Sequence, residues 1–311
     1  MSHAAPNRAT DGSRAPNGTY TESARPTGRP VLALVFVLGV ALLAAGCGSS
    51  DDATGDRTAA RGTSSRSVTV DGTTRGYRLY RPAGLTGRVP FVLVYHGWPQ
   101  NVQWAERLGW QQAADRHGFV VAFPIGLEAS FNAGACCGPA EVRDVDDLAA
   151  AHAIIDDIAR TTRLDRRRVY AAGFSNGGMM AYRLACESDR FAAIGPVAGA
   201  QLVDCAQRRP VSIMHIHGTA DTVVPFEGAE ASDVSRLPAT RLVLSEWRSR
   251  LGCAPAQETK RGDLGRSSSR CPGGRHVTLI TIRGLDHVWP TRAEGLDATE
   301  TLWRFFARHR R

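Results

Sequence analysis

The sequence predicts an α/β protein in which a mostly parallel β-sheet is flanked by helices on both faces. Short apolar runs alternate along the chain with longer amphipathic segments, which is the order of a doubly wound sheet. Several of these runs are continuously apolar, as in strands that are buried on both faces. The composition is that of an ordinary globular protein, with 43% hydrophobic and 22% charged residues.

Residues 1–46 predict a disordered N-terminus followed by a lipoprotein-type signal peptide. The first part is rich in Pro, Gly, Ser and Thr, and an uncharged apolar run follows over 31–46. That run is too short to span a bilayer comfortably and is shaped like a signal-peptide core. Leu43-Ala44-Ala45-Gly46-Cys47 is similar to the bacterial lipoprotein signal, in which the cysteine becomes a lipidated N-terminus. Ordinary secretion with Cys47 incidental is the alternative, and both predict export.

Residues 47–66 are expected to be a flexible tether, and 67–311 a single catalytic domain. The tether contains mainly Gly, Ser, Thr, Asp and Arg. The formal net charge is +8, and Lys260 is the single lysine. Because no basic run is interleaved with aromatic residues, we expect no nucleic-acid partner.

The expected elements follow the chain in order. Residues 67–70 and 77–80 form a hairpin around Asp71-Gly72. Further strands are expected over 90–95, 119–123, 168–172, 193–197, 211–216 and 277–282, and helices over 102–117, 145–160, 239–251 and 298–308. Only a short segment joins residue 197 to residue 211, so we expect no large lid and a shallow, open cleft.

The stretch 168–182 predicts a nucleophile elbow. Within it, Gly173-Phe174-Ser175-Asn176-Gly177 fits the pattern G-x-S-x-G between a strand and a helix. The serine of such a turn needs neighbours without a Cβ, so that strand and helix can approach each other. We therefore expect Ser175 to be a nucleophile.

A serine nucleophile needs a base and a carboxylate that orients the base. Functional groups of doubly wound sheets gather at the carboxyl ends of strands, and Asp221 and His287 each follow a predicted strand. The order Ser175, Asp221, His287 matches that of the α/β-hydrolase fold.

Other assignments of these residue types stay open. His215 and His217 lie two apart, as a metal pair would, but no further ligand lies beside them, so we expect no metal and no cofactor. His217 is instead expected to pack behind Asp221. Asp286 adjoins His287 and is the alternative orienting acid, whereas Asp146 and Asp147 open a helix and are expected to cap it.

Two backbone N–H groups are expected to stabilise an oxyanion. One belongs to Asn176, the residue after the nucleophile. The other belongs to Trp98, because His96-Gly97-Trp98-Pro99 follows a predicted strand and is similar to the His-Gly motif of esterases. For His96 itself we expect a hydrogen bond that stabilises the loop.

Six motifs together resemble the extracellular polyhydroxybutyrate depolymerase and feruloyl esterase family of carbohydrate-esterase type. They are Tyr95-His96-Gly97, Cys136-Cys137-Gly138, Val145-Asp146-Asp147, the elbow with its following helix over 173–182, His217-Gly218-Thr219-Ala220-Asp221 and His287-Val288-Trp289-Pro290. The resemblance implies an α/β-hydrolase carboxylesterase with Ser175, Asp221 and His287 as its triad. It also implies that Trp289 lines the substrate pocket; packing in the core is the alternative.

The expected function is that of an exported serine carboxylesterase that forms an acyl-enzyme on Ser175. Its substrates would be hydroxyalkanoate, feruloyl or acyl-sugar esters, small or polymeric. We expect a monomer that is anchored to the outer face of the cell membrane by a lipid on Cys47, or is secreted. A serine peptidase is disfavoured because no propeller or cap domain precedes the catalytic part, and a non-catalytic binding module is the remaining alternative.

The cysteines other than Cys47 predict three disulfides, because the protein is expected to be exported and their number is even. The candidates are Cys136, Cys137, Cys186, Cys205, Cys253 and Cys271. Cys253 and Cys271 bracket a polar loop and are expected to close it. We expect Cys136 and Cys137 to pair with Cys186 and Cys205, rather than with each other.

Overall fold

The computed structural model describes residues 61–205, 210–230 and 237–311. The chain divides into two units, 1–54 and 55–311, and all described residues belong to the second. The predicted signal segment, Cys47 and most of the tether therefore lie outside the described residues. In the part that is described, no helix combines the length and apolarity needed to cross a membrane.

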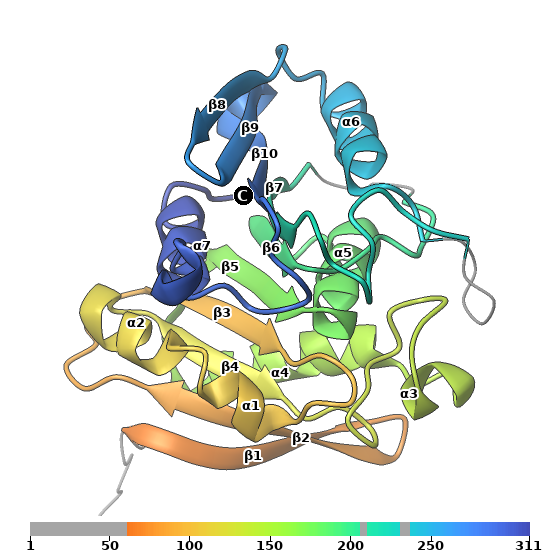
Figure 1. Ribbon diagram of the computed structural model, residues 1–311. Coiled ribbons are helices and arrows are strands. Elements are labelled where there is room, and N and C mark those ends of the chain that lie inside the picture. Colours follow the sequence, from red (N-terminus) through yellow and green to blue (C-terminus); the bar gives the residue numbers. More distant parts are fainter. Residues whose placement is uncertain (1–60, 206–209, 231–236) are drawn as a thin grey trace, which may run out of the picture. The chain divides into compact units, whose positions relative to one another are not determined.

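Within the described residues, ten strands form one sheet in the order β1-β2-β4-β3-β5-β6-β7-β10-β9-β8 (Figure 1). The strands β4, β3, β5, β6, β7 and β10 are mutually parallel, and antiparallel strands continue the sheet on both sides. The mostly parallel sheet is thus confirmed. The bounds are β1 Gly62–Val70, β2 Thr73–Arg81, β3 Val89–Tyr95, β4 Val120–Pro124, β5 Leu164–Phe174, β6 Ala193–Val197, β7 Ser212–Gly218, β8 Gln257–Arg261, β9 Leu264–Cys271 and β10 Arg275–Ile282.

Helices cover both faces of this sheet. On one face α4, α5 and α6 supply buried apolar side chains, and on the other face α1, α2 and α7 do so (Figure 1). Each helix buries one stripe of its surface, as an amphipathic sequence dictates. The bounds are α1 Val102–Glu106, α2 Trp110–His117, α3 Pro139–Val142, α4 Asp147–Thr161, α5 Asn176–Glu187, α6 Thr240–Arg250 and α7 Ala298–Phe306, with short 3₁₀ turns at Pro272–Gly274 and Arg292–Glu294.

The helix expected over 102–117 is divided into α1 and α2. Gly109 lies between them with a φ of 82°, in the left-handed region that side chains rarely adopt. The new helix starts at Trp110, which is fully buried against the sheet. A glycine inside an amphipathic pattern therefore marks the break between two helices here.

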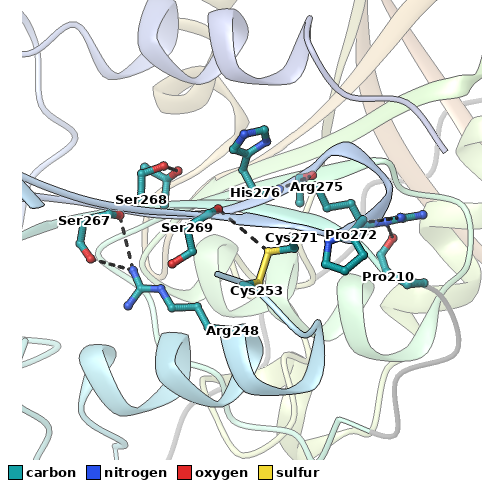
Figure 2. The surroundings of a disulfide bond; sticks show 12 residues. Pro210, Arg248, Cys253, Ser267, Ser268, Ser269, Cys271, Pro272, Arg275 and His276 are labelled. Atoms are coloured by element: carbon teal, nitrogen blue, oxygen red, sulfur yellow. Dashed lines mark hydrogen bonds between the residues drawn. A yellow bond between two sulfur atoms is a disulfide. The ribbon is translucent and has the colours of Figure 1, made fainter. Parts of the chain in front are cut away.

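The hairpin of β8 and β9 was not predicted. All five residues of β8 are exposed, and the buried side of β9 carries Ser267, Ser269 and Cys271. Small polar side chains give no apolar alternation from which a strand could be read. Figure 2 shows how β9 is held instead, by the disulfide to Cys253 and by Arg248 of α6, whose guanidinium donates to Ser267 Oγ at 2.9 Å.

The sheet begins earlier than the sequence suggested. Gly62–Arg66, expected in the tether, pair with β2 as part of β1. This edge strand alternates between half-buried and exposed residues and contains no continuous apolar run. Its pairing depends on the partner strand rather than on its own hydrophobic pattern.

The disulfides join Cys136 to Cys137, Cys186 to Cys205 and Cys253 to Cys271. The bridge between Cys253 and Cys271 is confirmed. The expectation that Cys136 and Cys137 pair with Cys186 and Cys205 is wrong, because Cys186 near the end of α5 lies beside Cys205, with their Cα atoms 4.7 Å apart. Sequence spacing alone could not choose among the connectivities.

Candidate active site

The expected nucleophile sits in a sharp turn between β5 and α5. Ser175 has φ 53° and ψ −120°, a conformation that is costly for a residue with a Cβ. Its backbone N–H donates to Val197 O at 2.9 Å, which ties the turn to the end of β6. The Ser175 side chain does not cap the helix, so its hydroxyl is available at the carboxyl edge of the sheet.

The glycines around Ser175 are required by close backbone approach. A Cβ on Gly173 would collide with the carbonyl of Gly177, and a Cβ on Gly177 would collide with the carbonyls of Tyr95 and His96. Strand β5, helix α5 and the end of β3 therefore meet at distances that no larger residue permits. This is the physical reason for the G-x-S-x-G pattern at this position.

Asp221 and His287 are joined by a hydrogen bond. His287 Nδ1 lies 2.7 Å from Asp221 Oδ2, and since a carboxylate only accepts, Nδ1 carries the hydrogen and Nε2 remains free. The other carboxylate oxygen accepts the N–H groups of Val223 at 3.0 Å and Val224 at 2.8 Å. Burial by itself would raise the pKa of Asp221, but hydrogen bonds from His217, His287 and the Val224 N–H hold the pKa well below its usual value.

Ser175 is adjacent to this pair through Phe174. The ring of Phe174, the residue before Ser175, lies 4.7 Å from the imidazole of His287, centroid to centroid. Among the described residues no side chain or backbone group is hydrogen-bonded to Ser175 Oγ. The structure thus joins the acid to the base and packs the base against the elbow. It does not contain the bond between Ser175 and His287.

Asp286, the alternative orienting acid, faces a different partner. Its Oδ1 accepts the N–H and hydroxyl of Thr222, at 3.0 and 3.1 Å, and the backbone N–H of His287 at 2.8 Å. These hydrogen bonds lower the pKa of Asp286. Asp286 therefore holds the loop after β7 to the loop after β10 and does not orient the imidazole.

His215 and His217 use both ring nitrogens in hydrogen bonds and have none left for a metal. His215 Nε2 lies 2.8 Å from His217 Nδ1, and the remaining nitrogens bond to Tyr182 and to the carbonyl of Val224. Over the described ranges, no three His, Cys, Asp or Glu residues are grouped so that they could hold a metal ion.

The loop after β3 runs past the serine. An atom in the Cβ position of Gly97 would lie 3.1 Å from Ser175 Cβ. The buried ring of His96 holds this loop in place. Its Nδ1 donates to the Gly97 carbonyl at 2.8 Å, and its Nε2 accepts the Gly126 N–H at 3.2 Å. Burial lowers the pKa of His96, so the neutral ring that this accepting role needs is favoured. Trp98, an expected oxyanion donor, follows directly.

Asn176 has a second role that the sequence analysis did not identify. As the first residue of α5 its N–H has no intrahelical partner, as an oxyanion donor requires. Its side chain is fully buried and forms hydrogen bonds with the loop over 131–136. Oδ1 accepts from Phe131 N at 2.8 Å, and Nδ2 donates to Phe131 O at 2.9 Å and to Cys136 O at 3.2 Å.

The same loop is held from the other side by Asp147. Asp147 forms a buried ion pair with Arg75 and accepts the N–H of Asn132 at 2.7 Å. Asp146 caps α4 by accepting the Ala149 N–H, as expected. The capping role expected for Asp147 is wrong, because its side chain points to Arg75 of β2 instead.

Trp289 packs into the core. It is 6% exposed, its ring packs edge-on against Trp110, and its N–H donates to Thr299 Oγ1 at 3.2 Å. These contacts are those of the core-packing alternative. The side chain two residues after His287 is therefore directed into the core.

Three large apolar side chains beside the candidate residues are instead exposed. Trp98 is 46% exposed, Val223 61% and Val288 41%. Trp98 follows the loop that touches Ser175, Val223 follows Asp221 by two residues, and Val288 follows His287.

The sequence profile of a family described as "Esterase PHB depolymerase" matches residues 75–257. The chain belongs to this esterase family. Among its relatives is the "Putative esterase NocK" of Nocardia uniformis subsp. tsuyamanensis, 34% identical over 258 residues that cover 73% of this chain and 74% of the relative. The "Feruloyl esterase B" of Piromyces equi is 33% identical over 66% of this chain, which spans 41% of that relative's length. This membership makes the chain a carboxylic ester hydrolase.

Solved structures of esterases share the fold. The "Acetyl xylan esterase from Aspergillus awamori" has a TM-score of 0.57 and 13% identity, over 79% of this chain and 99% of the other. The LpqC "poly(3-hydroxybutyrate) depolymerase from Bordetella parapertussis" has a TM-score of 0.54 and 17% identity, over 80% of this chain and 94% of the other. The predicted α/β-hydrolase fold is therefore confirmed.

Proposed function

We propose that this esterase hydrolyses carboxylic esters through an acyl-enzyme on Ser175, with His287 as the base and Asp221 as the acid that orients it. The observation that carries the proposal is the hydrogen bond between His287 Nδ1 and Asp221 Oδ2, because it leaves Nε2 as the ring nitrogen without a partner among the described residues, next to the elbow. Hydrogen bonds between nucleophile and base are often long without substrate and tighten when substrate binds.

The reaction would proceed in two halves. Ser175 Oγ attacks the ester carbonyl carbon while its proton passes to His287 Nε2. The N–H groups of Asn176 and Trp98 stabilise the oxyanion, and the alkoxide leaves as the alcohol after taking that proton. Water then attacks the acyl-enzyme while His287 Nε2 takes a proton from it. His287 returns that proton to Ser175 Oγ as the carboxylic acid is released, which restores the free serine.

The exposed apolar side chains of Trp98, Val223 and Val288 support an ester whose acyl group is aromatic or longer than acetyl. The names of the relatives support feruloyl and hydroxyalkanoate esters as the classes to examine. We therefore propose that feruloyl esters and hydroxybutyrate oligomers are hydrolysed in preference to acetylated sugars. A panel of the three, compared by kcat/KM, tests this order.

The catalytic assignment is tested with p-nitrophenyl butyrate. Ser175→Ala and His287→Ala are expected to lower kcat on the order of 10⁶-fold, the scale found when a member of a triad is removed. Ser188→Ala is the control, since it makes the same change just beyond the far end of α5. Labelling of the wild type but not of Ser175→Ala by a fluorophosphonate identifies the nucleophile. A Ser175→Ala variant that keeps more than a tenth of the activity refutes the assignment, and a wild type that binds esters without cleaving them is a binding module.

We also propose export and anchoring through a lipid on Cys47. The three disulfides support an oxidising compartment. In a bacterial host, the full chain is expected to partition into detergent and Cys47→Ser into the aqueous phase. Equal partitioning of both would refute lipidation and favour simple secretion.

A further inference from the structure

A line of buried polar side chains lies behind the candidate acid Asp221. Tyr182, His215 and His217 are each 1% exposed. The Tyr182 hydroxyl lies 2.7 Å from His215 Nδ1, and His215 Nε2 lies 2.8 Å from His217 Nδ1. His217 Nε2 lies 2.8 Å from the carbonyl of Val224 and 3.2 Å from Asp221 Oδ2. The line therefore ends on the carboxylate oxygen that His287 also contacts.

The direction of each hydrogen bond follows from the end of the line. The Val224 carbonyl and the Asp221 carboxylate can only accept, so His217 Nε2 must carry a hydrogen. In a neutral ring His217 Nδ1 then accepts, which makes His215 Nε2 the donor. His215 Nδ1 accepts in turn, and the Tyr182 hydroxyl donates to it. Every hydrogen in the line points toward Asp221.

The reverse direction is unfavourable. It would require His217 to be a buried imidazolium and would leave the buried Tyr182 hydroxyl hydrogen without an acceptor among the described residues. Burial, together with the neighbouring His217, lowers the pKa of His215 well below its usual value although Asp221 opposes this. Burial likewise raises the pKa of Tyr182. The neutral line is thus the arrangement that satisfies each donor.

The line connects the helix that carries the nucleophile to the loop that carries the acid. Tyr182 lies on α5, the helix that begins directly after Ser175, and His215 and His217 lie on one face of β7. The loop after β7 is held by His217 at both Asp221 and Val224. A movement of α5 relative to this loop would therefore break a buried hydrogen bond.

We infer that Tyr182, His215 and His217 are positioning residues. They fix the carboxylate of Asp221, and through it the imidazole of His287, relative to the elbow. The inference rests on the proposed function for Asp221. Since His217 takes one side of Asp221 Oδ2, the other side is left to His287 Nδ1. We expect these residues to raise the rate of the chemical step, and hence kcat, because none of the three side chains is exposed to contact substrate.

The tautomers can be read without any catalytic assay. In long-range ¹H–¹⁵N spectra of the ¹⁵N-histidine-labelled protein, His215 and His217 should be neutral Nε2–H tautomers and His287 the Nδ1–H tautomer. Single substitutions assign the signals. An Nδ1–H tautomer or an imidazolium at His215 or His217 at neutral pH overturns the inference, whatever the activity of the protein.

The kinetic test uses two matched pairs, with rates expressed per site titrated by a fluorophosphonate. His217→Leu is expected to lower kcat by about 10–100-fold with KM unchanged, by analogy with residues that orient the ligands of a catalytic metal. His217→Gln keeps a donor toward Asp221 and should recover most of that loss. Tyr182→Phe should lower kcat several-fold. Tyr170→Phe deletes another buried hydroxyl, which donates to the carbonyl of His309, and should leave kcat unchanged.

Two results would overturn the inference here. One is a His217→Leu variant that has lost total activity only in proportion to its lost titratable sites, so that its kcat per titrated site is that of the wild type. A purely structural role produces this result. The other is equal kcat in Tyr182→Phe and Tyr170→Phe. If Ser175→Ala retains activity, the proposed function fails instead, and the tautomer result still stands by itself.

Discussion

Replacing Asn176 by alanine tests how the nucleophile helix is tied to the loop over 131–136. The amide of Asn176 satisfies three groups of that loop, the N–H and carbonyl of Phe131 and the carbonyl of Cys136. The Cys136 carbonyl keeps a second donor, Ala133 N at 3.4 Å, whereas within the described residues neither the N–H nor the carbonyl of Phe131 has another partner. Two buried backbone groups would therefore lose their partners.

The magnitude follows from those two groups. A buried group left without its hydrogen bond costs about 1–3 kcal/mol, so Asn176→Ala should lower the free energy of unfolding by about 4 kcal/mol. The control is Asn132→Ala, on the same loop, whose side chain bonds to Gly134 of the loop and to Asp144 after α3. It should cost about 1 kcal/mol because these contacts are only partly buried.

Urea unfolding followed by tryptophan fluorescence measures both losses, and kcat on p-nitrophenyl butyrate measures the effect on the site. We expect kcat to fall by up to about 10²-fold in Asn176→Ala, since the same residue supplies the proposed oxyanion N–H. Asn132→Ala should keep the wild-type kcat per titrated site. Equal losses of stability in the two variants would refute the reasoning.

Three further predictions follow from the fold. Burial lowers the pKa of His309 from 6.5 to about 4, so the unfolded chain binds the proton first, and stability is lost as the pH falls from about 6.5 to about 4. In urea titrations at pH 7 and pH 4, His309→Asn should reduce that loss by about 3 kcal/mol, and an unchanged loss would contradict the prediction. Replacing Cys186 and Cys205 by serine opens a loop with a sequence separation of 19 residues and should cost about 3 kcal/mol in the same assay, whereas a cost below about 1 kcal/mol would argue against the bridge. Gly177→Ala should lower kcat about 10²-fold, because its Cβ would collide with the carbonyls of Tyr95 and His96. Gly178→Ala should lower kcat far less, because the nearest neighbours of its Cβ would lie at 3.1 Å, and equal kinetics of the two variants would contradict the close approach at Gly177.

The sequence by itself determined where along the chain the buried parallel strands and the elbow lie. Apolar runs such as 90–95 and 193–197 must be buried on both faces, and this property depends only on local composition. The G-x-S-x-G pattern likewise reports a local steric need, which the contacts of Gly173 and Gly177 explain. The family resemblance rested on the same local motifs and was borne out by the match over residues 75–257.

Only the tertiary structure decided which distant side chains meet. Asp221 and Asp286 were both possible partners of His287, and the choice depends on how two loops lie against each other. The pairing of Cys186 with Cys205 and the packing of Trp289 against Trp110 depend in the same way on contacts between separate segments of the chain.

The hairpin of β8 and β9 and the line from Tyr182 to Asp221 show the physical reason. Neither leaves a periodic hydrophobic pattern, because each is stabilised by hydrogen bonds or a disulfide to partners elsewhere in the fold. A sequence records what each segment prefers next to water or to a core. It does not record which polar partner a buried donor will find, since that is fixed only when the sheet has assembled.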